Sequence, residues 1–266
     1  MRNRLLYVSG IVVLCAWVLG PIYLIALSAV GGRQAVFAWP KSLWPSTFSL
    51  DALLFFFQID AVWTALLNSV ITAGLTMLFA VLLGAPAGYA LARYAFAGKT
   101  AYRLLLLATR AFPVSLLALP LAVTFIQWNL YDTPVGVAIV HTALALPFAA
   151  LVTSSLFMGI PVELEEAAWV FGCSRFKAFL KVVTPLALPG IAATAVFAFV
   201  ISWNEVFAAS VLTVRQRTLT AYLIFSLGES PLHFKFAGGL FLIVPVLVFI
   251  FAVRRYLFSM WGIASR

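Results

Sequence analysis

Charged residues are scarce in this sequence. Only 9% of its 266 residues are Asp, Glu, Lys or Arg, whereas soluble domains carry about 25%. Hydrophobic residues make up 64% of the chain, which excludes an ordinary soluble fold and places the chain in a lipid bilayer. The net charge of +9 is therefore attributed to cations that flank membrane spans, and nucleic acid is not expected as a partner.

Cysteine and histidine are also rare, with two residues of each. Cys15 lies in an apolar run and Cys173 in a polar stretch, so neither a disulfide nor a Cys/His metal site is predicted. His141 has no second histidine near it in the sequence. We interpret it as a hydrogen-bonded structural residue, with a ligand or proton-relay role as the alternative.

Catalytic sets are not apparent within the apolar segments. No paired carboxylates, no His pair and no Ser-His-Asp set stand out in the sequence. No catalytic residue is assigned and the chain is not predicted to be an enzyme. A membrane-embedded enzyme is the alternative from another functional class.

Apolar segments of membrane-spanning length recur along the chain. A helix needs about 20 apolar residues to cross the hydrocarbon core. The first segment is longer than a signal-peptide core of about 7–15 residues, so it is interpreted as an uncleaved span. We predict one all-α membrane domain over residues 1–266 with six transmembrane helices, at 5–30, 61–91, 104–127, 135–158, 186–212 and 238–257.

The distribution of Lys and Arg supports this topology, because cytoplasmic loops carry an excess of them. Eleven fall on the side predicted to be cytoplasmic: Arg2, Arg4, Arg93, Lys99, Arg103, Arg175, Lys177, Lys181, Arg254, Arg255 and Arg266. Five fall outside: Arg33, Lys41, Arg215, Arg217 and Lys235. Arg110 is left within a span. Both termini are therefore predicted to be cytoplasmic.

Residues 159–185 form the most polar stretch, here called the coupling elbow. Gly172 can end a first short helix with a positive φ, and Ser174 can cap a second helix. Pro185 and Pro189 are expected to interrupt that second helix before the next apolar span. The pattern predicts a cytoplasmic helix-turn-helix, whose first helix carries acidic residues near its positive end: Glu163, Glu165 and Glu166.

The elbow resembles the coupling loop of bacterial ATP-binding-cassette (ABC) importer permeases. That signature reads Glu-Ala-Ala, three residues, Gly, and a Pro about a dozen residues later. The matching positions here are Glu166, Ala167, Ala168, Gly172 and Pro185. Two positions depart from the usual form, since Phe171 replaces a common acidic residue and Trp169 is unusually bulky. These departures predict a more apolar partner surface.

Further segments resemble the carbohydrate branch of these permeases, which includes the second permease subunit of maltose-type importers. The C-terminus departs from that branch, because Trp261 to Arg266 replaces its Gly-rich tail. The resembling segments are Leu67-Asn-Ser-Val70, Ala87-Gly-Tyr-Ala-Leu-Ala-Arg93, Leu130-Tyr-Asp-Thr-Pro134, Ala145-Leu-Pro-Phe148, Ile160 to Ala168 and Ser202-Trp-Asn-Glu205.

The resemblance implies the type I importer permease fold with a cytoplasmic coupling helix, in the plasma membrane of a prokaryote. The implied partners are a different second permease, two ATP-binding subunits and an extracytoplasmic solute-binding protein, besides membrane lipid. ATP and Mg would be held by the ATPase. The segment Gly98-Lys-Thr100 lacks the earlier glycine of a phosphate-binding loop, so no nucleotide site is predicted. The implied coupling residues are Glu165, Glu166, Ala167, Ala168, Trp169 and Gly172.

Polar residues within spans are candidates for the transport pathway, because they are costly in hydrocarbon. Arg110 could instead snorkel or pair, and Glu205 could instead bridge neighbouring helices. The implied cargo is a sugar, a polyol or a related polar solute, with another polar metabolite as the alternative. An ion-coupled carrier without an ATPase is the other alternative. The pathway candidates are Arg110, Phe112, Trp203, Asn204 and Glu205.

Overall fold

The computed structural model describes residues 2–40, 42–44 and 48–260, and this part of the chain contains helices and no strands. Lys41 lies outside the described residues, and so does the predicted atypical tail, residues 261–266, which includes Arg266. In chain order the elements are α1 (Arg2–Val30), α2 (Gly32–Phe37), α3 (Asp51–Phe57), α4 (Asp60–Arg93), α5 (Lys99–Thr109), α6 (Val114–Gln127), α7 (Pro134–Met158), α8 (Glu163–Val170), α9 (Arg175–Ala178), the π-helical turn η1 (Phe179–Val183), α10 (Thr184–Asn204), α11 (Phe207–Leu212), α12 (Leu219–Ser226) and α13 (Leu232–Met260).

The helices bear out an all-α membrane protein that crosses the bilayer several times. Five described segments are long and apolar enough to span it: Leu6–Val30, Asp60–Arg93, Pro134–Met158, Arg175–Asn204 and Leu232–Val253. The third predicted span, 104–127, differs from a straight helix, because α5 and α6 meet at 88°. Pro113 stands at the start of α6 with an extended backbone, which is incompatible with continuing α5.

The chain divides into two compact units. The first comprises residues 1–64 and 222–248, and the second comprises 65–221 and 249–266. In the first unit, aromatic rings of α3 pack on α13, with Phe56 and Phe57 centred 6.0 and 5.5 Å from Phe241. The second unit holds the coupling elbow and the pathway candidates.

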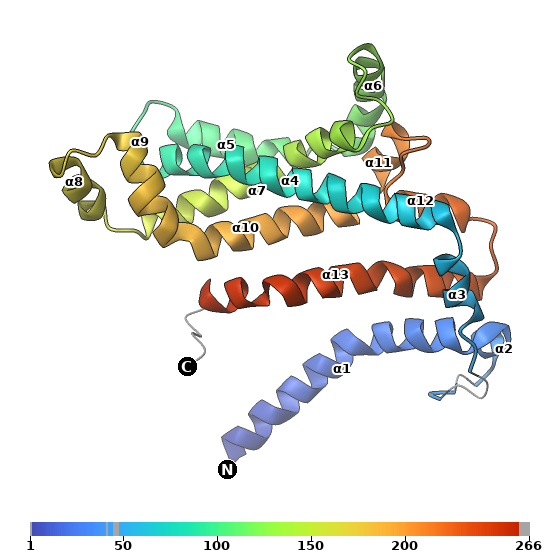
Figure 1. Cartoon of the computed structure of the whole chain (residues 1–266). Helices are drawn as coiled ribbons and strands as arrows, with labels where there is room; N and C mark the ends of the chain where they lie inside the picture. Colours follow the sequence, from blue (N-terminus) through green and yellow to red (C-terminus); the bar gives the residue numbers. More distant parts are fainter. Residues whose placement is uncertain (1, 41, 45–47, 261–266) are drawn as a thin grey trace. The chain divides into compact units, whose positions relative to one another are not determined.

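Helices α4, α7 and α10 form the core of the second unit (Figure 1). Gly84 and Gly88 of α4 allow α7 to approach closely. A Cβ added at Gly84 would lie 2.7 Å from Cβ of Ala149, and one at Gly88 would lie 2.1 Å from Oγ1 of Thr153. Small residues of the three helices continue this contact: Ala80, Ala145, Ala149 and Ala198.

The expected break at Pro185 and Pro189 does not occur. Residues Arg175–Asn204 form one apolar helical segment, and the proline-induced distortion is taken up by the π-helical turn η1 just before Pro185. Pro185 has no N–H and its ring crowds the preceding turn, so a wider turn relieves the clash. The hydroxyl of Thr184 donates to the carbonyl oxygen of Phe179 at 2.8 Å and satisfies one of the displaced carbonyls.

Candidate functional site

The turn of the coupling elbow has the conformation that its sequence predicts. Gly172 has φ +83°, in the left-handed region that favours glycine. Its N–H donates to the carbonyl oxygen of Trp169, and the N–H of Cys173 donates to that of Ala168, both at 2.9 Å. These two bonds make the Schellman arrangement that ends α8. Ser174 then caps α9 by accepting from the N–H of Lys177 at 3.3 Å.

The tip of the elbow exposes apolar side chains. Val170 is 86% exposed, Phe171 is 87% exposed and Phe176 is 69% exposed. Such large exposed hydrophobic groups around one turn mark a surface suited to a protein partner. The carboxylate of Glu166 and the methyl group of Ala167 are exposed on the same short helix.

Trp169 and Ala168 are half-buried at the inner side of the turn. The guanidinium carbon of Arg175 lies 4.8 Å from the centre of the Trp169 ring, within cation–π range. The bulky tryptophan therefore joins α8 to α9 across the glycine turn. The indole Nε1–H is buried and has no hydrogen-bond partner.

Glu165 points away from this surface. Its side chain is 1% exposed, and its carboxylate accepts hydrogen bonds from the Tyr89 hydroxyl and from Nε of Arg93. Of the six predicted coupling residues, Glu165 is thus the one that is sequestered inside the protein. One turn of α8 therefore divides its acidic residues between the interior and the exposed surface.

The pathway candidates lie at two different breaks in the helices. Arg110 and Phe112 are exposed at the corner between α5 and α6. Trp203 is buried at the end of α10, whereas Asn204 is exposed and its side-chain amide donates to the carbonyl oxygen of Val200. Glu205 follows at the break between α10 and α11, where predicted span 186–212 changes direction.

Glu205 is held in a buried polar cluster that the sequence does not reveal. Oε2 of its carboxylate lies 2.9 Å from Nε2 of His141, while Nδ1 of His141 lies 2.7 Å from Oγ of Ser202. The carboxylate also accepts the backbone N–H groups of Ala208 and Ala209 at 3.0 and 3.1 Å, so it caps α11. His141 is therefore hydrogen-bonded, as its interpretation as a structural residue predicts.

A serine, a histidine and a carboxylate therefore meet within the spans, although no such set was apparent in the sequence. The set has the composition of a catalytic triad, whose nucleophile must be reached by its substrate. Ser202 is 3% exposed and His141 is fully buried. Oγ1 of Thr76 lies 3.3 Å from Oγ of Ser202, so the cluster joins α4, α7 and α10.

A second polar cluster holds the loop between α11 and α12. Oδ1 of Asp132 accepts the backbone N–H groups of Val214, Arg215 and Gln216 at 2.8, 2.9 and 2.9 Å. Burial alone would raise the pKa of the Asp132 carboxyl. The three N–H donors and the charge of Arg215 outweigh burial and hold this pKa below its ordinary value.

The same loop is bound from α4. The side-chain amide of Asn68 donates to Oε1 of Gln216 at 3.0 Å, and Oγ of Ser69 accepts the N–H of Leu219 at 2.7 Å. Two sequence segments that resemble the importer permeases, Leu67–Val70 and Leu130–Pro134, therefore anchor one loop. About sixty residues separate the two segments in the sequence, so only the fold shows that they bind the same loop.

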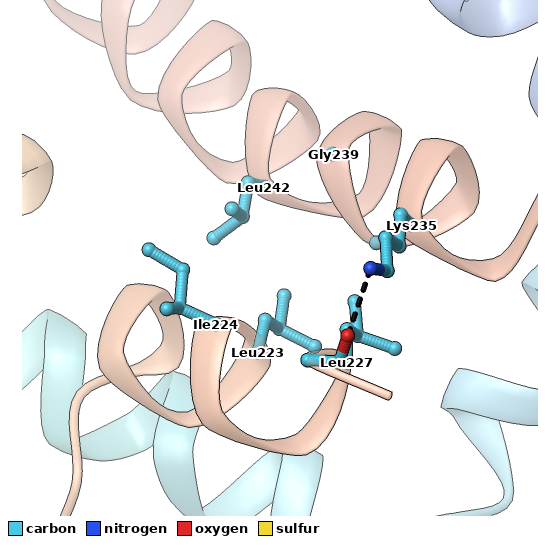
Figure 2. A pocket seen from close by; sticks show the side chains of 8 residues that line it. Leu223, Ile224, Leu227, Lys235, Gly239 and Leu242 are labelled. Atoms are coloured by element: carbon cyan, nitrogen blue, oxygen red, sulfur yellow. Dashed lines mark hydrogen bonds between the residues drawn. The ribbon is translucent and has the colours of Figure 1, made fainter. Parts of the chain in front are cut away.

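A cavity of about 270 Å³ lies between α12 and α13 in the first unit (Figure 2). Its walls are mainly aliphatic, and the ammonium group of Lys235 donates to the carbonyl oxygen of Gly228 at 2.8 Å beside it. A site for a polar solute needs several convergent polar groups, which this lining does not provide. The lining residues are Leu223, Ile224, Leu227, Gly228, Lys235, Gly238, Gly239 and Leu242, and none of the pathway candidates is among them.

Comparison with known families is decisive for the class of protein. Residues 80–259, more than half of the chain, match the family of inner membrane components of binding-protein-dependent transport systems. The chain belongs to this family. The matched region of this permease contains the elbow and, of the Glu205 cluster, His141, Ser202 and Glu205.

Two curated relatives are similar over most of the permease. The trehalose transport system permease protein SugB of Mycobacterium tuberculosis is 35% identical over 220 residues, covering 79% of each chain. The arabinooligosaccharides transport system permease protein AraQ of Halalkalibacterium halodurans is 30% identical over 219 residues, covering 80% of this chain and 77% of that one.

The fold is shared with a solved importer. A chain of a bacterial ABC transporter that imports the acidic polysaccharide alginate superposes with a TM-score of 0.73 at 20% identity. The superposition covers 96% of the permease and 98% of that chain. The predicted type I importer permease fold is thereby confirmed.

Proposed function

We propose that the permease is one of two different membrane subunits of an ATP-driven importer for a sugar, a polyol or a related polar solute. The trehalose and arabinooligosaccharide permeases among its relatives support a carbohydrate cargo. The family description supports delivery of that cargo by an extracytoplasmic binding protein. ATP and Mg belong to a separate ATPase, so this chain has no catalytic role.

The observation that carries the proposal is the exposed tip of the coupling elbow. Val170 and Phe171 are apolar but more than four-fifths exposed, and they lie at the end of helix α8, which Glu165 anchors by buried contacts. Burial of these groups in a groove of an ATPase would remove them from water, with a gain of about 25 cal/mol per Å². Glu166 would make polar contacts at the edge of that groove.

The rigid end of α8 supports a mechanical role. The Schellman turn and the Ser174 cap fix the path of the chain, so the elbow can move as one body with its partner. Closure of two ATP-binding subunits would then pull the elbow and shift the spans from an inward-facing to an outward-facing arrangement, and hydrolysis would reset them. Such a shift requires the ATPase to favour one of two arrangements of the spans. Both termini would be cytoplasmic, on the same side as the ATPase.

Gentle purification from native membranes tests the assembly. We expect an ATP-binding subunit and a second permease to copurify with the wild type, as identified by mass spectrometry. Glu166→Arg should deplete the ATPase, whereas Glu163→Arg, a matched charge reversal on the same helix, should retain it. Isolation of the wild-type chain alone or as a homo-oligomer would contradict the importer and favour an ion-coupled carrier.

Uptake measurements test the cargo. Cells lacking the permease should lose ATP-dependent uptake of labelled trehalose or labelled arabinooligosaccharide, and the restored gene should recover it. Competition by unlabelled sugars, polyols and amino acids then ranks the accepted solutes. If only amino acids compete, the carbohydrate assignment is wrong while the ATP-driven importer stands.

A further inference from the structure

The three carboxylates of α8 have different surroundings. Glu163 and Glu166 are exposed, whereas the side chain of Glu165 is 1% exposed. A buried carboxylate is costly unless it is paired and hydrogen-bonded, so the contacts of Glu165 must offset its desolvation.

Both oxygens of the Glu165 carboxylate are bound to the end of α4. Oε2 accepts from the hydroxyl of Tyr89 and Oε1 accepts from Nε of Arg93, each at 2.5 Å. Nη2 of Arg93 also donates to the carbonyl oxygen of Ile160 at 2.9 Å. The last turn of α4 therefore holds both α8 and the chain segment that leads into it.

Tyr89 connects this polar contact to the core of the second unit. Its ring lies 4.6 Å from that of Phe179 and 5.7 Å from that of Phe157, centre to centre. Phe179 is the first residue of the π-helical turn that leads into α10, and Phe157 lies near the end of α7. The hydroxyl of Tyr89 thus meets α8 while its ring packs between two spanning helices.

We propose that Glu165, with Tyr89 and Arg93, is a buried strut that transmits movement of the coupling elbow to α4. Glu165 is a positioning residue that acts from inside the protein, and the ATPase contacts the other face of α8. This proposal rests on the proposed function, because it assigns the internal end of the same coupling device.

The polar contact of Glu165 with Tyr89 and Arg93 is suited to transmit movement from α8 to α4. Apolar side chains can slide past one another with little change in energy, since the hydrophobic effect has no direction. A carboxylate bound by a guanidinium and a hydroxyl is directional, and removal from water strengthens it. Rotation or translation of α8 must therefore move the end of α4 or break these bonds.

The test uses the purified complex of permease, second permease, ATPase and binding protein. Cys15 and Cys173 are replaced by Ala, and Val214→Cys adds one thiol on the exposed loop between α11 and α12. The readout is the rate at which an impermeant maleimide labels position 214, before and after addition of ATP, Mg²⁺ and vanadate. Copurification of the ATPase is measured in parallel.

In the wild-type background we expect the nucleotide to change the labelling rate several-fold. Glu165→Gln should keep the ATPase bound but reduce that change to less than half. Glu163→Gln is the matched control, since it removes the same charge from an exposed position of α8, and it should leave the change intact. Tyr89→Phe keeps the ring in place and removes one hydrogen bond, so it should give an intermediate loss.

A full nucleotide response in both Glu165→Gln and Tyr89→Phe would overturn the strut. Loss of the ATPase from Tyr89→Phe would overturn it as well, because the cluster would then be needed for docking. If Glu165→Gln does not fold, Tyr89→Phe decides alone. Absence of an ATPase from the wild-type preparation would instead overturn the proposed function, and the strut with it.

Discussion

At the scale of single residues, the backbone conformation of Gly172 explains why glycine is needed at the turn of the coupling elbow. Gly172 has φ +83° and no heavy atom within 4 Å of the place where a Cβ would lie. A side chain would therefore fit in space, and the cost of replacing this glycine is conformational.

We expect Gly172→Val to abolish uptake while the protein still inserts into the membrane. Left-handed backbone in a β-branched residue costs roughly 1–3 kcal/mol, which is enough to displace α8 from α9. Gly172→Asn is the control, since asparagine tolerates this region and should retain part of the uptake. Normal uptake with Gly172→Val would refute the role of the turn.

Asp132 is a second single residue with a testable role, because its carboxyl group makes the stability of the fold depend on pH. Its pKa is lower in the folded protein than the ordinary value of 3.8, so the carboxylate stabilises the fold at higher pH. This stabilisation is complete above the ordinary pKa and is lost as the pH falls through the lowered one.

Asp132→Ala should cost about 1–3 kcal/mol, because three backbone N–H groups lose a charged acceptor. Thermal unfolding in detergent should show a lower Tm for the variant from neutral pH down to about pH 5. The difference in Tm should shrink only below the ordinary carboxyl pKa. A difference that vanishes near neutral pH would contradict this assignment.

At the scale of helices, the contact between α4 and α7 depends on two glycines. A Cβ at Gly88 would meet the N–H nitrogen of Ser154 at 2.7 Å and the carbonyl oxygen of Ala150 at 2.8 Å, as well as the Thr153 hydroxyl. Since two of these three neighbours are backbone atoms, rotation of a side chain cannot relieve the clash.

Gly88→Ala is therefore expected to destabilise the permease by about 1–3 kcal/mol, the usual cost of overpacking. Gly74→Ala on the same helix is the matched control, because nothing lies within 4 Å of its Cβ position. The measurement is the Tm of thermal unfolding of both variants in detergent. Equal Tm values would show that the two helices separate readily.

The break between α10 and α11 is the other feature at this scale. The carboxylate of Glu205 binds His141 and two N–H groups of α11, and this arrangement supports the structural interpretation that the sequence left open. Glu205 can still influence transport, because it sets the direction of the chain just after Asn204.

Glu205→Ala should lower stability by about 1–3 kcal/mol and reduce recovery of the assembled complex, since it leaves buried donors without an acceptor. Asn204→Ala should leave assembly unchanged, because its side chain is exposed and bonds only within α10. Yield of the complex and its Tm are the measurements. Reduced uptake with unchanged assembly in Glu205→Ala would instead favour a direct pathway role.

At the scale of the whole molecule, the positions of Lys and Arg predict the orientation in the membrane. Eleven of the seventeen Lys and Arg residues were assigned to the cytoplasmic side, which includes the coupling elbow. We therefore expect the loop after α11 to lie on the opposite side of the membrane from the coupling elbow.

Labelling of single thiols tests this orientation. With Cys15 and Cys173 replaced by Ala, an impermeant maleimide should label Arg215→Cys in spheroplasts and Thr100→Cys only after lysis. Both positions are exposed, so accessibility in the protein is matched. The opposite pattern would place the elbow outside and exclude ATPase coupling.

The sequence by itself determined the features that depend on neighbouring residues. The length of an apolar run decides whether it can cross a bilayer, and glycine at position 172 or serine at position 174 acts within its own turn. The family resemblance followed from such local patterns, and so did the coupling elbow. Its helices were predicted because helix ends and caps are set by residues a few positions apart.

Only the tertiary structure decided the contacts between residues far apart in the chain. His141 and Glu205 are 64 positions apart, and Glu165 lies 76 positions from Tyr89. No local rule told Glu165 from Glu166, because both suit the first turns of a helix equally well. Glu165 is the one that is buried, because α4 packs against the elbow and supplies Tyr89 and Arg93 as partners for its charge. Burial of a carboxylate is tolerated only where the fold supplies such partners.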